Sequence, residues 1–174
     1  MRSTMTLILA TTAIIFLSGC CVKFSNLTSG DTYNVGDTIT TSQANIVVEQ
    51  FQWPNGTWTT SGHATVDDRN YGQGSGNDLN ANNVNLNFQF DYPVEKITLK
   101  FGELGGNNNI SVNGGFQNVP NLVDLNGNSI NGVQITVNAS QQGNNWYGTM
   151  ELDGTINEFK IGGQELWLDD VCPE

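Results

Sequence analysis

Tryptophan and tyrosine side chains beside turns are the residues of this sequence best suited to binding a ligand. The flat faces of these rings pack on the C–H patches of sugars, while amide and carboxylate groups pair with sugar hydroxyls. Two tryptophans flank a Pro-Asn-Gly turn, an aromatic pair follows a Gly-Asn turn, and one tryptophan lies on the last predicted strand. These candidates are Trp53, Trp58, Trp146, Tyr147 and Trp167. The alternative is that these rings only pack within the protein.

Aspartates near the two ends of the chain form a second candidate site, for a calcium ion. Ca²⁺ takes six to eight oxygen ligands, and loops rich in Asp, Asn and Gly supply such ligands. Asp31 and Asp37 flank the opening turns, and Asp169 and Asp170 lie near the carboxyl end. Joining the two ends of the chain would place these acids at the same end of the fold. The competing interpretation is that they are solvated surface groups.

Residues suited to catalysis are sparse. His63 is the sole histidine and there is no G-x-S-x-G motif, so a nucleophilic triad is not expected. A glycosidase requires two carboxylates about 5 to 9.5 Å apart across a cleft. The available glutamates, Glu103, Glu151, Glu158 and Glu165, do not form a glycosidase motif. We therefore expect no enzymatic activity and keep a glycosidase as an alternative.

The charge balance excludes one large class of partner. The 174 residues include 6 Lys and Arg against 17 Asp and Glu, which gives a net charge of -11. Binding to nucleic acid depends on neutralising phosphates with cationic side chains, so nucleic acid is not an expected partner. The 24 Asn and 20 Gly suit turns and the wet faces of short strands. Length and composition predict one domain, expected to be a monomer.

Residues 1–19 have the pattern of a removable export signal. Arg2 gives a basic start, and the apolar stretch from Met5 to Leu17 is shorter than the roughly 20 residues of a membrane span. The segment Leu17-Ser18-Gly19-Cys20 resembles the lipobox of bacterial lipoproteins at all four positions. The alternative is an ordinary secretory signal that is followed by a cysteine by chance.

The lipobox resemblance implies a membrane anchor. Cleavage before Cys20 and acylation of that residue would leave residues 20–30 as a lipidated terminus with a short tether or first strand, followed by a single domain, residues 31–174. Two or three acyl chains hold a protein stably on a bilayer. The resemblance places the protein in the cell envelope. Because Cys21 rather than Asp follows Cys20, it implies the outer membrane in a host with two membranes.

Two cysteines remain after lipidation, at opposite ends of the domain. Exported proteins fold in an oxidising compartment, so Cys21 and Cys172 are expected to form a disulfide. The alternatives are that Cys21 carries a second lipid or remains a free thiol.

Short segments with alternating apolar and polar residues predict an all-β domain. The clearest are 84–90, 96–101, 110–112 and 133–137, with further strands expected at 32–35, 38–41, 46–51, 57–60, 63–66, 159–161 and 165–171. Asp153-Gly154 predicts a tight hairpin, and segments 71–83 and 102–109 are expected to be loops. Within the last strand, Trp167 is expected to face away from Leu166 and Leu168. About ten strands without intervening helices predict an antiparallel β-sandwich or barrel.

The order of these segments also resembles bacterial secreted jelly-roll modules of the carbohydrate-binding and lectin-like kind. The resemblance rests on CVKF, GDTYNVGDTI, NNVNLNF, FGELGGNNNISVNGG and IGGQELWLDDVC. It implies a jelly-roll-like sandwich with both termini on adjacent strands.

The expected function is that of a non-catalytic envelope lipoprotein whose β-sandwich binds a glycan or another envelope component through loop aromatics and Asn side chains. The alternative is a structural or adhesive surface lipoprotein that has protein partners and no small-ligand site.

Overall fold

The fold is given by a computed structural model that describes residues 21–174. Its paired strands are all antiparallel and the described chain contains no α-helix, so the predicted all-β class is confirmed. The strands are β1 (Thr32–Asn34), β2 (Thr38–Thr40), β3 (Asn45–Gln52), β4 (Trp58–Thr59), β5 (His63–Asp67), β6 (Asp78–Asn82), β7 (Val84–Gln89), β8 (Val94–Val112), β9 (Gly115–Val119), β10 (Ser129–Ile130), β11 (Val133–Gln142), β12 (Asn145–Ile156) and β13 (Phe159–Pro173). One 3-10 helix, η1 (Leu122–Leu125), precedes β10.

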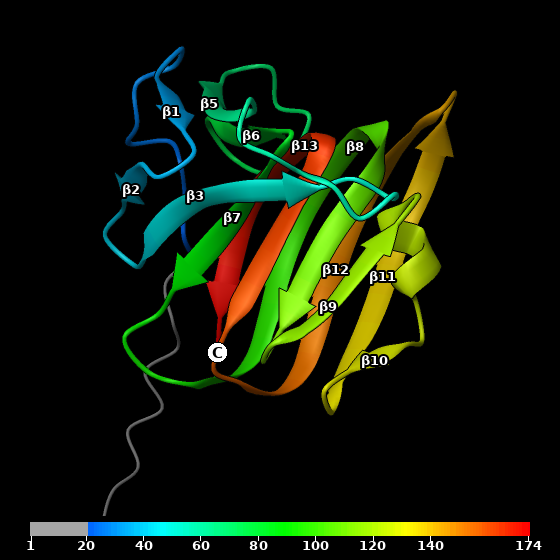
Figure 1. Ribbon diagram of the computed structural model, residues 1–174. Coiled ribbons are helices and arrows are strands. Elements are labelled where there is room, and N and C mark those ends of the chain that lie inside the picture. The colour runs from blue at the N-terminus through cyan, green and yellow to red at the C-terminus, as the bar shows by residue number, and fades with distance from the viewer. Residues whose placement is uncertain (1–20) are drawn as a thin grey trace, which may run out of the picture.

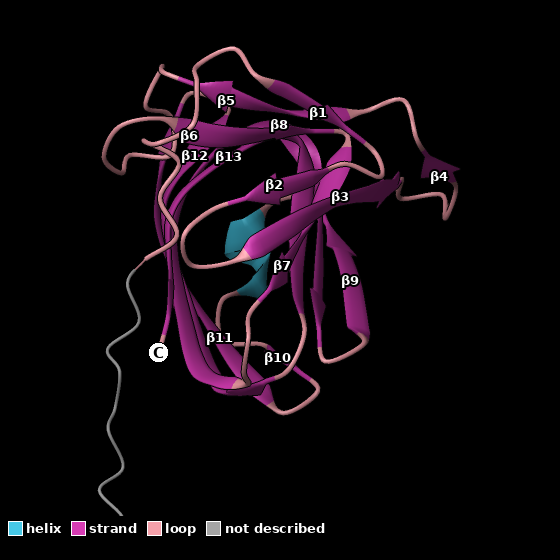
Figure 2. Ribbon diagram, turned by 90° about the vertical axis from the view of Figure 1, so that its left-hand side faces the viewer, coloured by secondary structure: helices cyan, strands magenta, loops and turns pink. Residues whose placement is uncertain are grey.

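The strands belong to one sheet that folds over on itself into two layers (Figures 1 and 2). Layer A has the strand order β1-β5-β6-β13-β8-β12-β11-β10. Layer B has the order β2-β3-β7-β13-β8-β9, and the short strand β4 pairs with the end of β3. The long strands β8 and β13 pair with each other in both layers, so they join the two layers. The jelly-roll connectivity that the resemblance implies stays a prediction.

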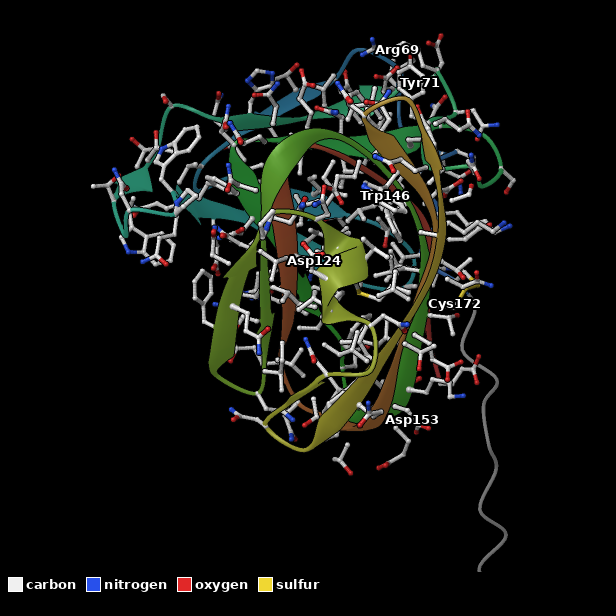
Figure 3. The ribbon with its side chains drawn as sticks, turned by 90° about the vertical axis from the view of Figure 1, so that its right-hand side faces the viewer. Arg69, Tyr71, Asp124, Trp146, Asp153 and Cys172 are labelled. Atoms are coloured by element: carbon white, nitrogen blue, oxygen red, sulfur yellow. A yellow bond between two sulfur atoms is a disulfide. The ribbon has the colours of Figure 1, made fainter. Side chains whose placement is uncertain are left out.

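A corner in β8 takes the chain from one layer to the other (Figure 3). Glu103 pairs with β12 in layer A, whereas Asn108 pairs with β9 in layer B, and Gly105 and Gly106 lie between them. Glycine tolerates such a bend because it has no side chain. The prediction of a loop at 102–109 was wrong, since the glycines bend a continuous strand and do not end it.

Two other predicted connections were also wrong. Residues 78–82 of the expected loop 71–83 form β6, which pairs with β5 and β13 in spite of its polar sequence. The Asp153-Gly154 pair does not make a hairpin, because β12 continues to Ile156 with a register shift against β8. Gly154 has a φ of 137°, so its conformational freedom produces an irregularity within the strand and not a reversal of the chain.

Alternation along the strands builds the core between the layers. In layer B the inward residues include Leu86, Ile110 and Ile161, and layer A contributes Leu99 and Leu152. The helix η1 lies between the layers, and its Leu122 and Leu125 are fully buried (Figures 2 and 3). Burial of these apolar groups is the main force that holds the layers together. The alternate residues of layer B therefore face outward.

The two ends of the described chain lie together. Cys21 and Cys172 form a disulfide, as predicted, and Val22 forms an antiparallel bridge with Val171. The bridge agrees with the adjacent termini that the jelly-roll resemblance implies. The signal segment 1–19 and the lipidation residue Cys20 lie outside the described residues. Within the described part of the chain, no helix is both long and apolar enough to cross a bilayer.

Candidate functional site

A groove of about 390 Å³ lies on the outer face of layer B. Its floor comes from β7, β8 and β13, one side comes from β3 and β4, and Phe116 of β9 reaches Trp58 of β4. In Figure 2, β4 and β9 are seen on the same side of the molecule. The lining residues are Glu49, Gln52, Trp58, Asn85, Asn109, Ile110, Ser111, Gly114, Phe116, Glu158 and Lys160.

Two exposed aromatic rings lie side by side at this groove. Trp58 is 53% exposed and Phe116 is 40% exposed, and their ring centroids lie 6.1 Å apart. Trp58 follows a turn in which the Asn55 side chain accepts the Thr57 backbone N–H at 3.0 Å. Phe116 follows Asn113-Gly114, where both residues have positive φ values, as a tight hairpin turn requires. Two separate turns thus bring an aromatic pair to one surface.

The sequence-based candidates did not include Phe116. The dipeptide Asn113-Gly114 is a strong hairpin signal, and Ile110 and Val112 before it fix which residues face the core. Extending that alternation through the turn would have predicted β9. It would also have placed Phe116 on the outer face.

Polar side chains form a row across the floor, which we call the polar row. Glu49 on β3, Asn85 on β7, Gly162 on β13, Asn109 on β8 and Asn118 on β9 are successive cross-strand neighbours. Asn109 donates nothing to the protein through its Nδ2 atom, and the Oδ1 atom of Asn85 accepts no hydrogen bond. Buried polar groups are normally paired, so these two atoms are unsatisfied hydrogen-bonding positions within the row.

Lys160 places a positive charge between two carboxylates at the groove. Its Nζ lies 3.0 Å from Glu49 Oε2 and 2.9 Å from Glu158 Oε1. Partial burial lowers the pKa of Lys160, but the hydrogen bonds to Glu158 and Glu49 outweigh it and hold this pKa above its usual value. The ammonium group therefore stays charged and joins the two glutamates across the groove.

Of the five predicted aromatic residues, only Trp58 lines this groove. Trp167 faces away from Leu166 and Leu168, as expected, but it is only 4% exposed because residues 68–77 lie over it and contact it through Arg69 and Tyr71. We call these residues the cap loop. The Trp167 Nε1–H donates to Asp67 Oδ2 at 2.8 Å, and the ring packs edge-on against Tyr71 at 5.0 Å. For Trp167 the alternative interpretation, packing beneath a loop, describes the structure.

The other three aromatic residues lie apart from Trp58. Trp53 packs edge-on against Phe51 at 5.3 Å and lines a different hollow, at the corner of the sheet. Trp146 packs against the core from β12, as Figure 3 shows. Tyr147 is half-buried and lies against Gly102 of β8. The five rings do not converge on one surface.

Three of the four predicted calcium ligands are engaged in hydrogen bonds or an ion pair, and the fourth is exposed. Asp37 accepts the Asn34 backbone N–H at 2.8 Å, and Asp169 accepts that of Asp170 at 2.7 Å. Asp170 pairs with Lys100 at 2.8 Å, and Asp31 is exposed before β1. Residues 21–174 contain no group of three or more His, Cys, Asp and Glu arranged to hold a metal ion. The structure adds no support for the calcium site.

Only one of the four glutamates considered for glycoside hydrolysis lines the groove, Glu158. Glu103 is 2% exposed and faces η1, where its Oε2 accepts the Leu122 backbone N–H at 2.9 Å. Burial raises the pKa of Glu103 to about 7, against the opposing effect of this hydrogen bond. Glu103 is thus a buried structural acid.

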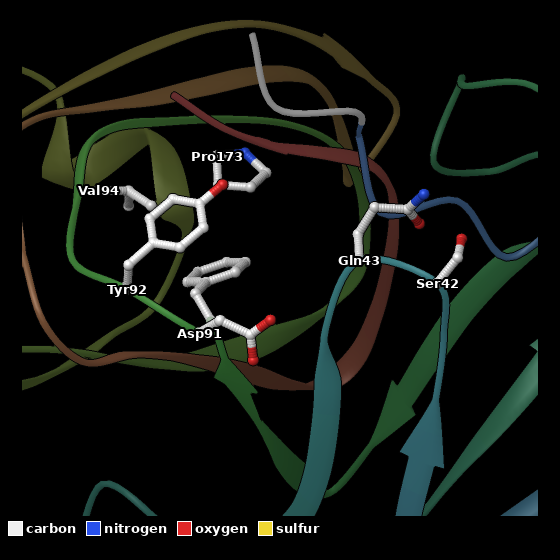
Figure 4. Close-up of a pocket in the computed structure, with 7 residues that line it drawn as sticks. Ser42, Gln43, Asp91, Tyr92, Val94 and Pro173 are labelled. Atoms are coloured by element: carbon white, nitrogen blue, oxygen red, sulfur yellow. The ribbon is translucent and has the colours of Figure 1, made fainter. Parts of the chain in front are cut away.

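A second hollow, of about 200 Å³, lies between the β2–β3 and β7–β8 connections (Figure 4). Its lining includes Tyr92 and Pro173, and the Tyr92 ring lies beside Pro173 in this view. None of the buried side-chain N and O atoms that lack a partner in the described chain belongs to its lining residues. The groove on layer B is therefore the better candidate for a polar ligand.

Comparison with known proteins found no matching protein family, no similar curated protein and no similar solved structure.

Proposed function

We propose that this protein is an envelope lipoprotein that binds a glycan, without catalysis, in the groove of layer B. The observation that carries the proposal is the exposed pair Trp58 and Phe116 beside a floor of asparagine side chains. A contiguous exposed apolar patch rimmed by polar residues often marks a binding site, and these two rings are neighbours on the surface. Sugars match this surface because each sugar ring has apolar C–H faces, which suit the aromatic rings, and polar hydroxyl groups at its edges, which suit the asparagines.

Aromatic rings beside the groove would bind the apolar faces of a sugar, and polar groups on its floor would bind the hydroxyls. A sugar face packs on Trp58 or Phe116, which removes apolar surface from water. Hydroxyl groups bond to Asn85 and Asn109 on the floor, and those near the rim bond to Lys160 and its carboxylate partners. Since Glu49 and Glu158 both pair with Lys160, neither is placed as a free proton donor, which favours binding over hydrolysis.

The membrane anchor belongs to the same proposal. The disulfide ties Cys21 to β13, so a lipid on the neighbouring Cys20 would hold the folded domain close to the bilayer. Mass spectrometry of the amino-terminal peptide from the membrane fraction is expected to show acyl groups on Cys20. A mature chain that starts at another residue would contradict the anchor.

A glycan array tests the binding function. Full-length protein, purified in a detergent without a sugar headgroup, is expected to bind a defined set of glycans. Trp58→Ala should reduce this binding at least about ten-fold, because stacking on an aromatic ring and the apolar burial it brings contribute more than about 1.4 kcal/mol.

Tyr92→Ala is the matched control for Trp58→Ala. Tyr92 is 56% exposed, close to the 53% of Trp58, but it lies outside the groove. The control should bind as the parent protein does. A lack of any glycan binding by the parent would refute the proposal and favour the structural or adhesive alternative.

A further inference from the structure

The orientation of two asparagine side chains in the polar row is fixed by the backbone of β3. Asn85 Nδ2 donates to the Gln50 carbonyl at 2.7 Å. Asn118 Nδ2 donates to the Gln52 carbonyl at 3.1 Å and to Asn109 Oδ1 at 2.7 Å. A backbone carbonyl only accepts hydrogen bonds, so these contacts determine which end of each amide is nitrogen. The remaining atoms are an acceptor, Asn85 Oδ1, and a donor, Asn109 Nδ2.

Both remaining atoms lack a partner within the described chain. Asn85 is 5% exposed and Asn109 is 1% exposed, and both line the groove. A buried polar group without a partner destabilises a protein, because it has lost its hydrogen bonds to water without gaining others. A ligand that pairs with both atoms removes this penalty. Both atoms are buried, so a ligand reaches them only when neighbouring lining side chains shift.

Gly162 keeps the space between the two asparagines free of a side chain. It is the cross-strand neighbour of both Asn85 and Asn109. A Cβ atom at this position would lie 2.5 Å from Asn85 Oδ1 and 2.0 Å from the Val84 carbonyl oxygen. Any larger residue would therefore displace the free acceptor. The donor and the acceptor remain on either side of an open backbone position.

We infer that the groove selects sugars that carry an acetamido group, an inference that rests on the glycan-binding function proposed above. An acetamido group presents one N–H and one carbonyl oxygen in a single plane. Its N–H donates to Asn85 Oδ1 and its carbonyl accepts from Asn109 Nδ2, so both unpaired atoms are satisfied by one substituent. Its methyl group is apolar and suits a position beside Phe116 or Trp58. A single hydroxyl at the same sugar carbon is shorter and reaches fewer partners.

Titration calorimetry with matched trisaccharides tests this inference on the full-length protein. Tri-N-acetylchitotriose and cellotriose share one backbone and differ in the acetamido or hydroxyl group at C2. We expect the acetylated sugar to bind at least ten-fold more tightly. Equal affinity, or a preference for cellotriose, would overturn the inference and leave glycan binding intact. Binding of neither sugar, together with an empty glycan array, would remove the proposed function itself.

A capped tri-alanine peptide separates a sugar site from a peptide site, since it also presents amide N–H and carbonyl groups. Binding of the peptide more tightly than the acetylated sugar would overturn the inference. Binding of the acetylated sugar alone would support it.

Asn109→Asp tests the donor directly, because it replaces Nδ2 with an acceptor and keeps the shape of the side chain. It should abolish the preference for the acetylated sugar. Asn138→Asp, on an exposed position of β11, is a control with the same change of charge and should retain the preference. A preference that survives in a folded Asn109→Asp protein, checked by its thermal unfolding, would contradict the assigned role.

Discussion

Trp167 in layer A and Trp58 beside layer B both lie on outer faces next to polar side chains, yet the first is 4% exposed and the second 53%. The cap loop covers Trp167, and the indole N–H is paired with Asp67. No segment of residues 21–174 covers Trp58 in this way, and the asparagines below it keep two unpaired atoms. The comparison shows that residue type alone does not identify a binding surface. Coverage and hydrogen-bond satisfaction separate the two regions.

The cap loop is held down by backbone contacts to buried acids. The Gly72 N–H donates to Asp78 Oδ2 at 2.8 Å, and the Ser75 N–H donates to Asp169. A Cβ on Gly74 would lie 1.8 Å from Asp169 Oδ2, so this approach requires glycine. These contacts make the cap loop part of the folded domain, in contrast to the uncovered groove.

The largest effect on stability is expected from Trp167→Ala. The variant removes a buried indole and leaves Asp67 without one of its donors, so the free energy of unfolding should fall by about 3–5 kcal/mol. Chemical denaturation of the disulfide-bonded protein measures this change. A loss below 1 kcal/mol would mean that the cap loop does not depend on the ring beneath it.

The buried acid Asp78 should make stability depend on pH. Burial, reinforced by the charge of Asp169, raises the pKa of Asp78 to about 6, from 3.8 for an exposed aspartate. The folded state then binds the proton more tightly than the unfolded state. Ionisation of Asp78 therefore opposes folding, and its contribution lowers the free energy of unfolding as the pH rises from about 4 to about 6.

Replacing Asp78 with Asn should flatten this pH dependence and raise stability at pH 7. Denaturation curves between pH 4.5 and pH 6.5 test this, and Glu103 and Asp169, whose pKa values are also raised by burial, account for the slope that remains. Hydrogen bonds from Arg69 lower the pKa of Asp67. The stability that ionised Asp67 contributes is therefore lost only at a pH below the range of these curves. Identical slopes in the parent and the variant would show that Asp78 does not couple folding to protons.

A smaller effect is expected from Arg69→Ala. The guanidinium bonds Asp67 through two nitrogens and lies 5.5 Å from the Trp167 ring centroid, but its side chain is 59% exposed. Solvent weakens such an ion pair, so the free energy of unfolding should fall by about 1 kcal/mol. Thermal unfolding at low and high salt checks this, and an effect independent of salt would point to packing and away from charge.

The smallest effect on stability is expected from Trp58→Ala, the same substitution in the uncovered region. Because the side chain is largely exposed, the free energy of unfolding should change by no more than about 0.5 kcal/mol. Denaturation under the conditions used for Trp167→Ala makes the two values comparable. A loss similar to that of Trp167→Ala would show that the Trp58 side chain has a structural role and would weaken its assignment to ligand binding.

Much of the fold could be predicted from local alternation. Segments such as 84–89 and 133–137 have one apolar face, and the structure places them in strands. The corner of β8 could not be predicted in this way, because the sequence Gly105-Gly106 is typical of a loop. Only the pairing of β13 with β8 on both sides of these glycines shows that the strand continues. The polar strand β6 was missed for a related reason, since its buried Asp78 and Asn80 are compatible with a strand only through tertiary contacts.

The candidate site could be predicted only in part. The turn before Trp58 indicates an exposed ring. Asparagines at alternate positions within a strand, such as Asn85 and Asn87, indicate a polar face. The sequence does not show that the cap loop covers Trp167 or that β9 brings Phe116 to Trp58. Both depend on contacts between segments far apart in the chain, which alternation within one segment does not report.

Strand β13 pairs with β6, β7 and β8, so residues 159–173 lie at the centre of the sheet. A growing chain that lacks residues 159–173 has no partner with which to complete these pairings. Completion of the sheet therefore requires residues 159–173, and contacts this distant along the chain favour slow folding. A chain cut short before residue 159 would leave three strands with unpaired backbone groups, which are sites for aggregation.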